Sequence, residues 1–290
     1  MLEKTYSCLN GRYVLASRAA VPVTDRGFRF GDGVFETIRL TQGVPYRWEA
    51  HITRLTEGLT ALRIPAPKTD LAVTARRLIR KNKTGEGFLR IAVSRGTGSR
   101  GYLPHPPTAP ANWLIEHLPP TPVPQQPYRL WLSTRARIPL QCLPTNAKLA
   151  QGLGSTLALL EAQDYACDEA LQLSTGGLLC EAASANLFWI KHETLCTPSL
   201  ETGCLAGVTR ETLLRLSPLP TRVLEANIAE LQSAEAVFLS NTRLGVWPVH
   251  TLQPMGWEWR AEHPIIQQLQ QALADDRDVY TAAHRKAWCA

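Results

Sequence analysis

In both halves of the chain, some segments alternate apolar and polar positions with the period of two of a strand, and others repeat apolar positions with the period of 3.6 of a helix. In the first half, runs of the strand type predict strands at 12–15, 34–40, 88–93 and 113–118. Two helices are expected between them. The first carries an apolar stripe from Ile52 to Leu62, and the second follows Asp70, a favourable N-cap residue.

The second half shows the same mixture at higher density. Strands are predicted at 129–133, 170–174, 187–190, 194–197, 236–239 and 246–249, and helices at 152–166, 208–216, 228–233 and 264–274. Residues 119–127 (PPTPVPQQP) separate the halves, because proline continues neither a helix nor a central strand. We therefore predict an N-terminal α/β domain at 1–118, a proline-rich linker at 119–127 and a C-terminal domain at 128–290.

The fold class that follows is α/β, a mixed α+β protein, since strands and helices occur in both halves. A length of 290 residues suits two domains of ordinary size. Ligands commonly bind where two such domains meet, so we expect a ligand site in the cleft between them.

Composition excludes several classes of protein. Apolar residues make up 44% of the chain and charged residues 19%, which excludes a disordered chain. No apolar run is long enough to span a membrane, and the first residues lack the order of a signal peptide. The seven cysteines show no metal-binding spacing, so we expect free thiols, no metal, no membrane association and a cytoplasmic protein.

The net charge of +6 raises the question of a nucleic-acid partner. The basic residues are spread along the chain, and the densest run, 76–83, ends a predicted helix, so we expect no nucleic acid. Of the 31 basic residues, 24 are arginines and seven are lysines. Arginine binds carboxylate and phosphate in a bidentate manner, so this bias favours a small anionic substrate.

Lys148 and Glu181 are the first candidates for chemistry. Lys148 lies between a strand and a helix with no acid within ten residues, and such a lysine can serve as an amine nucleophile and base. Glu181 is one acid among small and apolar residues, and it would pair with a protonated ring nitrogen or with an arginine. A solvent-facing Lys148 and a structurally paired Glu181 are the alternative interpretations.

Three segments are suited to bind an anion. His51 and Arg54 are three residues apart on the first helix and are expected to project to one side, away from Ile52 and Leu55. Residues 207–209 (GVT) precede a predicted helix, whose first amides bind phosphate readily, and residues 240–242 (SNT) offer hydroxyls. A lysine, a carboxylate and a phosphate site together match pyridoxal 5'-phosphate.

Four motifs, TDRGFRFGDGVFETIR (24–39), HITRL (51–55), EAASANLF (181–188) and GVTR (207–210), resemble those of the class IV aminotransferases, the fold type IV pyridoxal-phosphate enzymes. Within that family the chain is most similar to the aminodeoxychorismate lyases, through SRGTGSRGY (94–102), DEAL (168–171) and SNTRLGVWPV (240–249). The resemblance covers about residues 10–250. It implies a smaller N-terminal domain, a larger C-terminal domain and a cofactor in the cleft between them.

The resemblance also implies roles for single residues. Lys148 forms the internal aldimine and then moves the substrate proton, and Glu181 pairs with the pyridine nitrogen. The phosphate group is held by Arg54, the amides of Val208 and Thr209, and the Thr242 hydroxyl. Members are typically homodimers, and Arg100, Arg95 and Glu36 are the expected substrate-binding residues. An exposed loop without function is the alternative for Arg95 and Arg100.

The reaction implied is elimination of pyruvate from 4-amino-4-deoxychorismate, giving 4-aminobenzoate for folate biosynthesis. The alternative is a transaminase for D-amino acids or branched-chain L-amino acids. Glu36 keeps that alternative open, because some lyases carry threonine there, and 148–151 (KLAQ) departs from the Lys-x-x-Asn run of many relatives. A binding protein without catalysis is a third hypothesis, which no aromatic and basic stripe supports.

Overall fold

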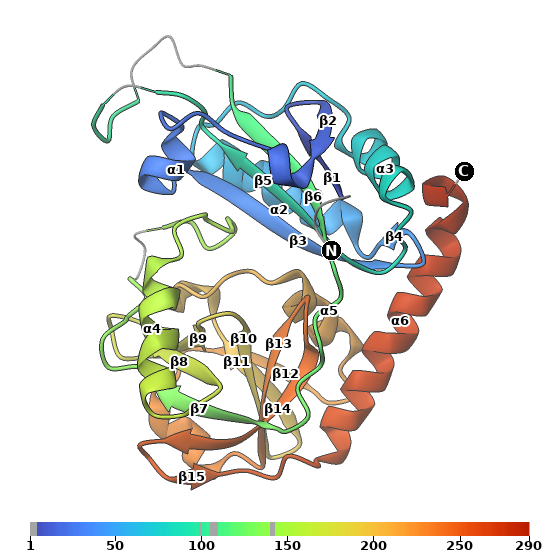
Figure 1. Ribbon diagram of the computed structural model, residues 1–290. Helices are drawn as coiled ribbons and strands as arrows, with labels where there is room; N and C mark the ends of the chain where they lie inside the picture. The colour runs from blue at the N-terminus through green and yellow to red at the C-terminus, as the bar shows by residue number, and fades with distance from the viewer. Residues whose placement is uncertain (1–4, 99, 105–109, 140–142, 290) are drawn as a thin grey trace. The chain divides into compact units, whose positions relative to one another are not determined.

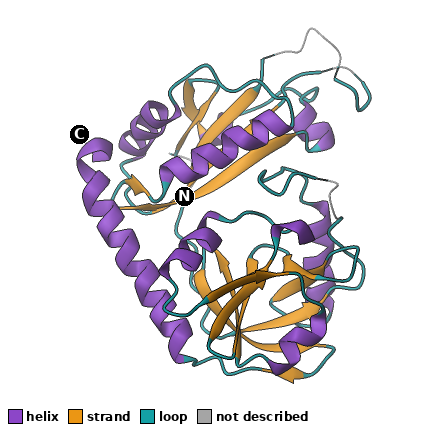
Figure 2. Cartoon of the chain, turned by 180° about the vertical axis from the view of Figure 1, so that it is seen from behind, coloured by secondary structure: helices purple, strands orange, loops and turns teal. Residues whose placement is uncertain are grey.

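The computed structural model describes residues 5–98, 100–104, 110–139 and 143–289 (Figures 1 and 2). Strands and helices occur throughout these residues, which confirms the predicted mixed α/β class. The chain divides into two compact units. Unit 1 consists of residues 1–121, 146–151 and 277–290, and unit 2 consists of residues 122–145 and 152–276.

Unit 1 contains a six-stranded sheet whose strand order is β2-β1-β6-β5-β3-β4. All neighbouring strands in it are antiparallel. The strands are β1 (Tyr6–Leu9), β2 (Arg12–Leu15), β3 (Gly33–Thr41), β4 (Val44–Pro45), β5 (Gly87–Ser94) and β6 (Asn112–Leu118). In β3 every second side chain is buried, and this inward row includes Val34, Glu36, Ile38 and Leu40. One acid therefore lies in an otherwise apolar row.

Helices cover this sheet. The helical segments of unit 1 are η2 (Ala16–Arg18), α1 (Arg26–Phe30), α2 (Trp48–Ala61) and α3 (Leu71–Asn82). Helix α2 packs on β3, and it crosses the sheet face turned to the viewer in Figure 2. As predicted, the Asp70 side chain caps α3, accepting a 3.0 Å hydrogen bond from the Val73 amide. The last part of α6 (Pro264–Cys289) belongs to this unit, where Trp288 packs edge-on against Trp48.

Unit 2 contains a nine-stranded sheet. Its strands are β7 (Tyr128–Leu132), β8 (Glu169–Leu173), β9 (Leu179–Ala182), β10 (Asn186–Lys191), β11 (Thr194–Pro198), β12 (Thr221–Leu224), β13 (Ala236–Asn241), β14 (Gly245–Gln253) and β15 (Trp257–Glu258). The order is β12-β11-β10-β13-β14-β7-β8-β9, with β15 beside β14. Strand β9 also pairs with β10 through Glu181 and Asn186, which closes six of these strands into a ring.

The helical segments of unit 2 are α4 (Leu153–Asp164), η3 (Leu200–Thr202), α5 (Val208–Leu216), η4 (Ile228–Ser233) and the first part of α6. Helix α4 packs along β7 and β8, as Figure 1 shows, and α5 packs against β13. The core inside the ring is apolar and includes Leu130, Leu171, Leu187 and Trp189, all fully buried. No helix among the described residues is long and apolar enough to cross a membrane.

All ten predicted strands are confirmed within one or two residues, apart from β14, which continues to Gln253. The predicted helix at 264–274 is too short, because α6 continues to Cys289. The structure also contains elements that the sequence pattern does not predict: β1, β4, β9, β12, β15 and α1. His51 and Arg54 project to one side as predicted, since both contact Glu36, and they are buried, as is Leu55.

The units differ from the predicted domains at two segments. Residues 146–151 and 277–290 were placed in the C-terminal domain, but both belong to unit 1. Residues 148–150 join unit 1 through backbone pairing with the start of β3: the Phe35 amide donates to the Lys148 carbonyl, and the Ala150 amide donates to the Gly33 carbonyl, each at 2.9 Å. Residues 119–127 contain no helix or strand and connect β6 to β7.

Candidate active site

Lys148 is held in unit 1 by its own backbone. The pairing with β3 fixes residues 148–150, and Leu149 forms a bridge with Val34. The Lys148 ammonium lies 4.8 Å from the centroid of the Phe35 ring, and the side chain is half-buried. The candidate nucleophile is therefore attached to the sheet rather than to the helix α4 that follows it in sequence.

Glu36 and two side chains of α2 form a buried polar cluster beneath the sheet of unit 1. Arg54 donates through Nε to Glu36 Oε1 and through NH2 to Glu36 Oε2, both at 2.7 Å. His51 Nδ1 lies 2.7 Å from Glu36 Oε2. Glu36 has no exposed surface and Arg54 is 8% exposed. The carboxylate thus fixes the guanidinium of the predicted phosphate ligand.

The charges in this cluster are set by burial and by these contacts. Burial opposes ionisation of Glu36, but hydrogen bonds from His51 and Arg54, together with the charge of Arg54, hold the pKa of its carboxyl below the ordinary value. Burial lowers the pKa of His51, and the nearby charges of Arg54 and Lys148 lower it further, against the influence of Glu36. His51 is therefore neutral near pH 7 and donates its Nδ1 proton to Glu36.

In unit 2, Glu181 lies on β9 and is oriented through one of its oxygens. Glu181 Oε2 accepts hydrogen bonds from Asn186 Nδ2 and from the Leu205 amide, both at 3.1 Å. Asn186 Nδ2 also donates to the Leu205 carbonyl at 2.8 Å. Asn186 is 6% exposed. These bonds connect the closing strand pair of the ring to the segment that enters α5.

Helix α5 begins at Val208 with Gly207 as its N-cap, and no side chain caps it. A Cβ at Gly207 would lie 2.0 Å from Asn186 Oδ1, so only glycine fits between Asn186 and the helix. Val208 and Thr209 are the first two residues of the helix, and their amides are among those that an α-helix leaves without a partner within the helix. This is the geometry that the anion prediction requires.

Thr242 lies in the turn between β13 and β14. Asn241 fixes that turn, because its Oδ1 accepts the Leu244 amide at 2.7 Å and its Nδ2 donates to the Ser184 carbonyl at 3.1 Å. Ser184 belongs to the connection between Glu181 and Asn186. The Thr242 turn and the Glu181 strand pair are thus joined by hydrogen bonds within unit 2.

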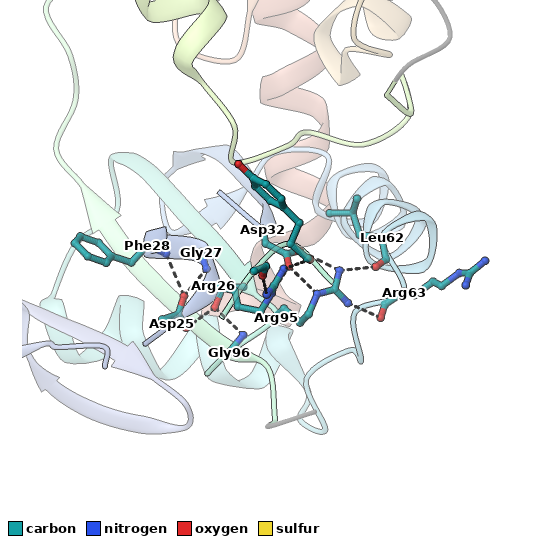
Figure 3. A network of polar contacts seen from close by, with 12 residues as sticks. Asp25, Arg26, Gly27, Phe28, Asp32, Leu62, Arg63, Arg95 and Gly96 are labelled. Atoms are coloured by element: carbon teal, nitrogen blue, oxygen red, sulfur yellow. Dashed lines mark hydrogen bonds and ion pairs between the residues drawn. The ribbon is translucent and has the colours of Figure 1, made fainter. Parts of the chain in front are cut away.

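The three predicted substrate-binding residues differ in their surroundings. Arg100 is exposed. Arg95 uses Nε and NH2 on the carboxylate of Asp32, and it also donates to the carbonyls of Leu62 and Arg63 (Figure 3). The contacts of Glu36 and Arg95 are those of side chains that position other parts of the protein. Only Arg100 presents an exposed guanidinium.

The sequence analysis missed the roles of Asn186 and of the pairing between Glu36 and Arg54. Asn186 is the last polar residue of the motif at 181–188, five residues after Glu181. That spacing was a usable signal, since two residues in a short hairpin connection face each other across the strands. Glu36 occupied an inward position of a predicted strand, which also indicates a buried partner.

The residues of each unit fit pyridoxal 5'-phosphate. In unit 2, Ser240 Oγ, two residues before Thr242, is buried with no hydrogen-bond partner in the described part of the chain. It lies on β13, against which the uncapped helix α5 packs. A phosphate would supply the acceptors that a helix start requires, and Glu181 would supply the carboxylate for a ring nitrogen. In unit 1, Lys148 supplies an amine and Arg54 a fixed guanidinium.

Comparisons with known proteins identify the family of the chain. The family described as amino-transferase class IV matches residues 33–252. The aminodeoxychorismate lyase of Vibrio harveyi is 31% identical over 241 residues, which cover 79% of this chain and 86% of that protein.

Solved structures are also similar to this chain over nearly its whole length. The 4-amino-4-deoxychorismate lyase of Pseudomonas aeruginosa has a TM-score of 0.80 and 32% identity, covering 94% of this chain and 99% of that chain. The branched-chain amino acid aminotransferase of Escherichia coli has a TM-score of 0.87 and 25% identity, covering 94% of each chain. With its fold, its donor set and a family match over most of its length, the chain belongs to the class IV aminotransferases, enzymes that use pyridoxal 5'-phosphate.

Proposed function

We propose that this enzyme is a 4-amino-4-deoxychorismate lyase, which eliminates pyruvate and forms 4-aminobenzoate for folate biosynthesis. The observation that carries the proposal is the similarity to the lyase of Pseudomonas aeruginosa, at 32% identity over 94% of this chain and 99% of that one. The exposed Arg100 and the excess of arginine over lysine support it further, because aminodeoxychorismate carries two carboxylates.

Two residues of unit 1 hold the cofactor in this proposal. Lys148 binds it through the ε-amine, and Arg54 pairs with its phosphate. The support for Arg54 is its fixed orientation: two hydrogen bonds of 2.7 Å to the buried Glu36 leave the guanidinium little freedom. A phosphate ligand that is oriented in advance loses less entropy when the phosphate binds.

Residues of unit 2 are suited to the ring and the phosphate of pyridoxal 5'-phosphate. Glu181 accepts a hydrogen bond from the ring N–H and keeps the proton on that nitrogen, and its orientation by Asn186 and the Leu205 amide supports this role. The amides of Val208 and Thr209, at the uncapped start of α5, and the Thr242 hydroxyl bind the phosphate.

When bound, the cofactor supplies an aldehyde that joins the substrate amino group and a protonated ring that accepts electrons. Lys148 would hold the cofactor before the substrate binds. With the substrate amino group in its place, the Lys148 amine would be free to remove the proton from the ring carbon that bears that nitrogen. The bond between the ring carbon and the enolpyruvyl oxygen would break, the released enolpyruvate would take up a proton to become pyruvate, and the six-membered ring would become aromatic, which gives the elimination its driving force.

Arg100 binds a substrate carboxylate in this proposal. Its guanidinium is exposed, whereas Arg95 and Glu36, which were also predicted to bind substrate, contact protein groups. We propose instead that Glu36 orients Arg54 and that Arg95 fixes the end of α2. Glu36 then acts on the site through Arg54, and Arg95 acts on it through helix α2.

A transaminase for D-amino acids or branched-chain L-amino acids is the second candidate. The TM-score of 0.87 with the branched-chain aminotransferase of Escherichia coli and the presence of Glu36 favour it. Lys148 would then return the proton to the cofactor rather than drive elimination. The two candidates differ in one requirement, since a transaminase needs a 2-oxo acid as acceptor and a lyase does not.

Lys148→Ala tests the roles in the lyase proposal. Removing the amine is expected to lower turnover of aminodeoxychorismate by at least about 10³-fold, because the nucleophile and the base are lost together. Lys191→Ala is the control, since Lys191 forms an ion pair with Glu230 at 3.0 Å in unit 2 and has no proposed role in catalysis. Full turnover in Lys148→Ala would refute the assignment.

We also propose that the enzyme forms a homodimer through α4. Leu153, Leu157 and Leu160 recur at helical spacing and are 70%, 47% and 51% exposed, so the helix presents an apolar row to solvent. A second copy of the chain would cover this row.

We propose a cytoplasmic location for the enzyme. The described cysteines are free thiols, which supports this proposal, because the cytoplasm is a reducing compartment.

A further inference from the structure

In unit 1, the carboxylate of Asp32 accepts hydrogen bonds from two arginine side chains (Figure 3). Arg26 Nε donates to Asp32 Oδ2 at 2.8 Å, and Arg95 donates through Nε to Oδ2 at 2.7 Å and through NH2 to Oδ1 at 3.0 Å. Burial opposes ionisation of Asp32, but the hydrogen bonds from Arg95 and Arg26 hold the pKa of its carboxyl below the ordinary value. One carboxylate therefore fixes two guanidinium groups.

Arg95 connects this carboxylate to the end of α2. Its NH2 donates to the Leu62 carbonyl at 2.8 Å and its NH1 to the Arg63 carbonyl at 3.0 Å. These carbonyls follow the last turn of the helix that carries Arg54. The Arg95 contacts thus attach Asp32 to a rigid element of unit 1.

Arg26 uses its other two nitrogens on a different segment. Its NH1 donates to the Gly101 carbonyl at 2.9 Å, and its NH2 donates to the Tyr102 carbonyl. Arg26 is 3% exposed, whereas Arg100 is exposed and Tyr102 is 86% exposed. A buried guanidinium therefore holds the backbone of a segment whose side chains face solvent.

Aromatic contacts strengthen this attachment. The guanidinium carbon of Arg26 lies 4.8 Å from the centroid of the Phe30 ring, and the rings of Phe30 and Tyr102 are 5.4 Å apart. Gly98 leaves room for Arg26, because a Cβ at that position would lie 2.5 Å from Arg26 Cδ. A side chain at residue 98 would displace the arginine.

We propose that Arg26 is a positioning residue that fixes the backbone next to Arg100 and so sets the position of the Arg100 guanidinium at the substrate carboxylate. The part that concerns Arg100 rests on the proposed function. Lysine cannot replace Arg26, because a single ammonium cannot span the Asp32 carboxylate and two carbonyls with fixed geometry.

Trypsin cleavage at the Arg100–Gly101 bond, followed by mass spectrometry, tests the attachment without any assay of activity. Cleavage requires the segment to leave its anchored conformation, so its rate reports local opening. In Arg26→Lys we expect cleavage about tenfold faster than in the parent enzyme, from the loss of two charge-assisted hydrogen bonds. Arg29→Lys is the matched control, since Arg29 lies three residues further in α1 and is exposed.

Gly98→Ala provides a second variant that keeps Arg26 itself. We expect it to accelerate the same cleavage, because the added methyl group collides with the Arg26 side chain. The proposal would be overturned if the folded Arg26→Lys variant were cleaved at the parent rate. If Arg26→Lys does not fold, the same result in Gly98→Ala would overturn it.

Kinetics then test the consequence for the substrate. For aminodeoxychorismate we expect Arg26→Lys to raise KM about tenfold while kcat stays within about a factor of two, as for a lost binding contact. Adding Arg26→Lys to Arg100→Ala should have no further effect on KM, because the two residues act in series. An additive effect, or a loss confined to kcat, would refute the action through Arg100. If the parent enzyme does not act on aminodeoxychorismate, the lyase proposal fails while the cleavage result still decides the attachment.

Discussion

Asn186 and Glu181 face each other as the strand pair that closes the ring of unit 2, and Asn186 Nδ2 also donates to Glu181 Oε2 at 3.1 Å. The pair that completes the fold therefore also orients the carboxylate assigned to the cofactor ring. Gly207 at the start of α5 touches the other end of the same asparagine side chain. Asn186 thus contacts both Glu181 and the start of α5, the proposed phosphate site.

The first prediction concerns Asn186→Ala. Glu181 would keep the Leu205 amide but lose a donor that restricts its rotation, so we expect kcat to fall about tenfold and the cofactor absorbance to shift as the ring loses its fixed partner. Steady-state kinetics and absorbance spectra measure both effects. Asn227→Ala serves as control, because the Asn227 side chain caps η4 and has no proposed role at the site. If Asn186→Ala kept the kcat and the absorbance spectrum of the parent enzyme, the proposed role of Asn186 in orienting Glu181 would be contradicted.

Glu36→Gln tests the support of Arg54. The amide removes a buried negative charge and turns one acceptor into a donor that faces the guanidinium, so we expect the free energy of unfolding to fall by about 3 kcal/mol. The affinity for pyridoxal 5'-phosphate should fall about tenfold, since Arg54 loses its orientation. Urea unfolding and equilibrium dialysis measure the two quantities. Glu116→Gln, on β6 of the same sheet, should leave the affinity unchanged.

The hydrogen-bonded carboxylate of Glu161 should make the stability of the enzyme depend on pH. Its carboxylate accepts hydrogen bonds from Ser133 Oγ at 2.7 Å and from the Thr134 amide at 3.1 Å. Burial works against ionisation, but hydrogen bonds from Thr134 and Ser133 lower the pKa of Glu161 from 4.5 to about 2. The stabilisation is therefore fully present above pH 4.5 and is lost as the pH falls towards 2.

Glu161→Gln should accordingly destabilise the enzyme by an amount on the order of 2 kcal/mol near pH 7. The difference from the parent enzyme should shrink as the pH falls below 4.5, where the parent also loses the charged interaction. Urea unfolding at a series of pH values measures this, with the exposed Glu201 changed to Gln as control. A difference that stays constant with pH would contradict the assignment.

Leu157→Glu tests the apolar row of α4. A charge in the centre of a dimer interface would remain unpaired and buried, so we expect the variant to be a monomer at micromolar concentration. Light scattering coupled to size-exclusion chromatography measures the mass. Val279→Glu, on α6 and 71% exposed, is the control and should keep the parent mass. A dimeric Leu157→Glu protein would exclude this face as the interface.

Local signals were sufficient to predict most of the fold. Strands β3, β5 and β13 alternate or are continuously apolar, and α3 has an N-cap residue and a regular stripe, so neighbouring residues alone indicate them. The end of α6 was missed because the charged run at 275–278 (DDRD) interrupts its stripe. That half of the helix is held by Tyr280 and Trp288, whose partners Tyr46 and Trp48 lie more than 200 residues away.

The candidate site was predictable in its chemistry and less so in its contacts. Lys148, Glu181 and the start of α5 carry motifs that can be recognised in the sequence. The inward position of Glu36 indicates a buried partner, but it does not identify Arg54, because that pairing depends on the packing of α2 against β3. The same holds for Asp32, whose partners Arg26 and Arg95 come from opposite sides of its own position in the sequence.

The most direct test of the lyase proposal is the reaction of the cofactor-loaded enzyme with aminodeoxychorismate in the absence of any 2-oxo acid. We predict that 4-aminobenzoate and pyruvate appear in equal amounts over many turnovers, since elimination needs no acceptor. Formation of neither product, by an enzyme that transfers the amino group of a D-amino acid or a branched-chain L-amino acid once a 2-oxo acid is added, would contradict the lyase proposal and establish the transaminase.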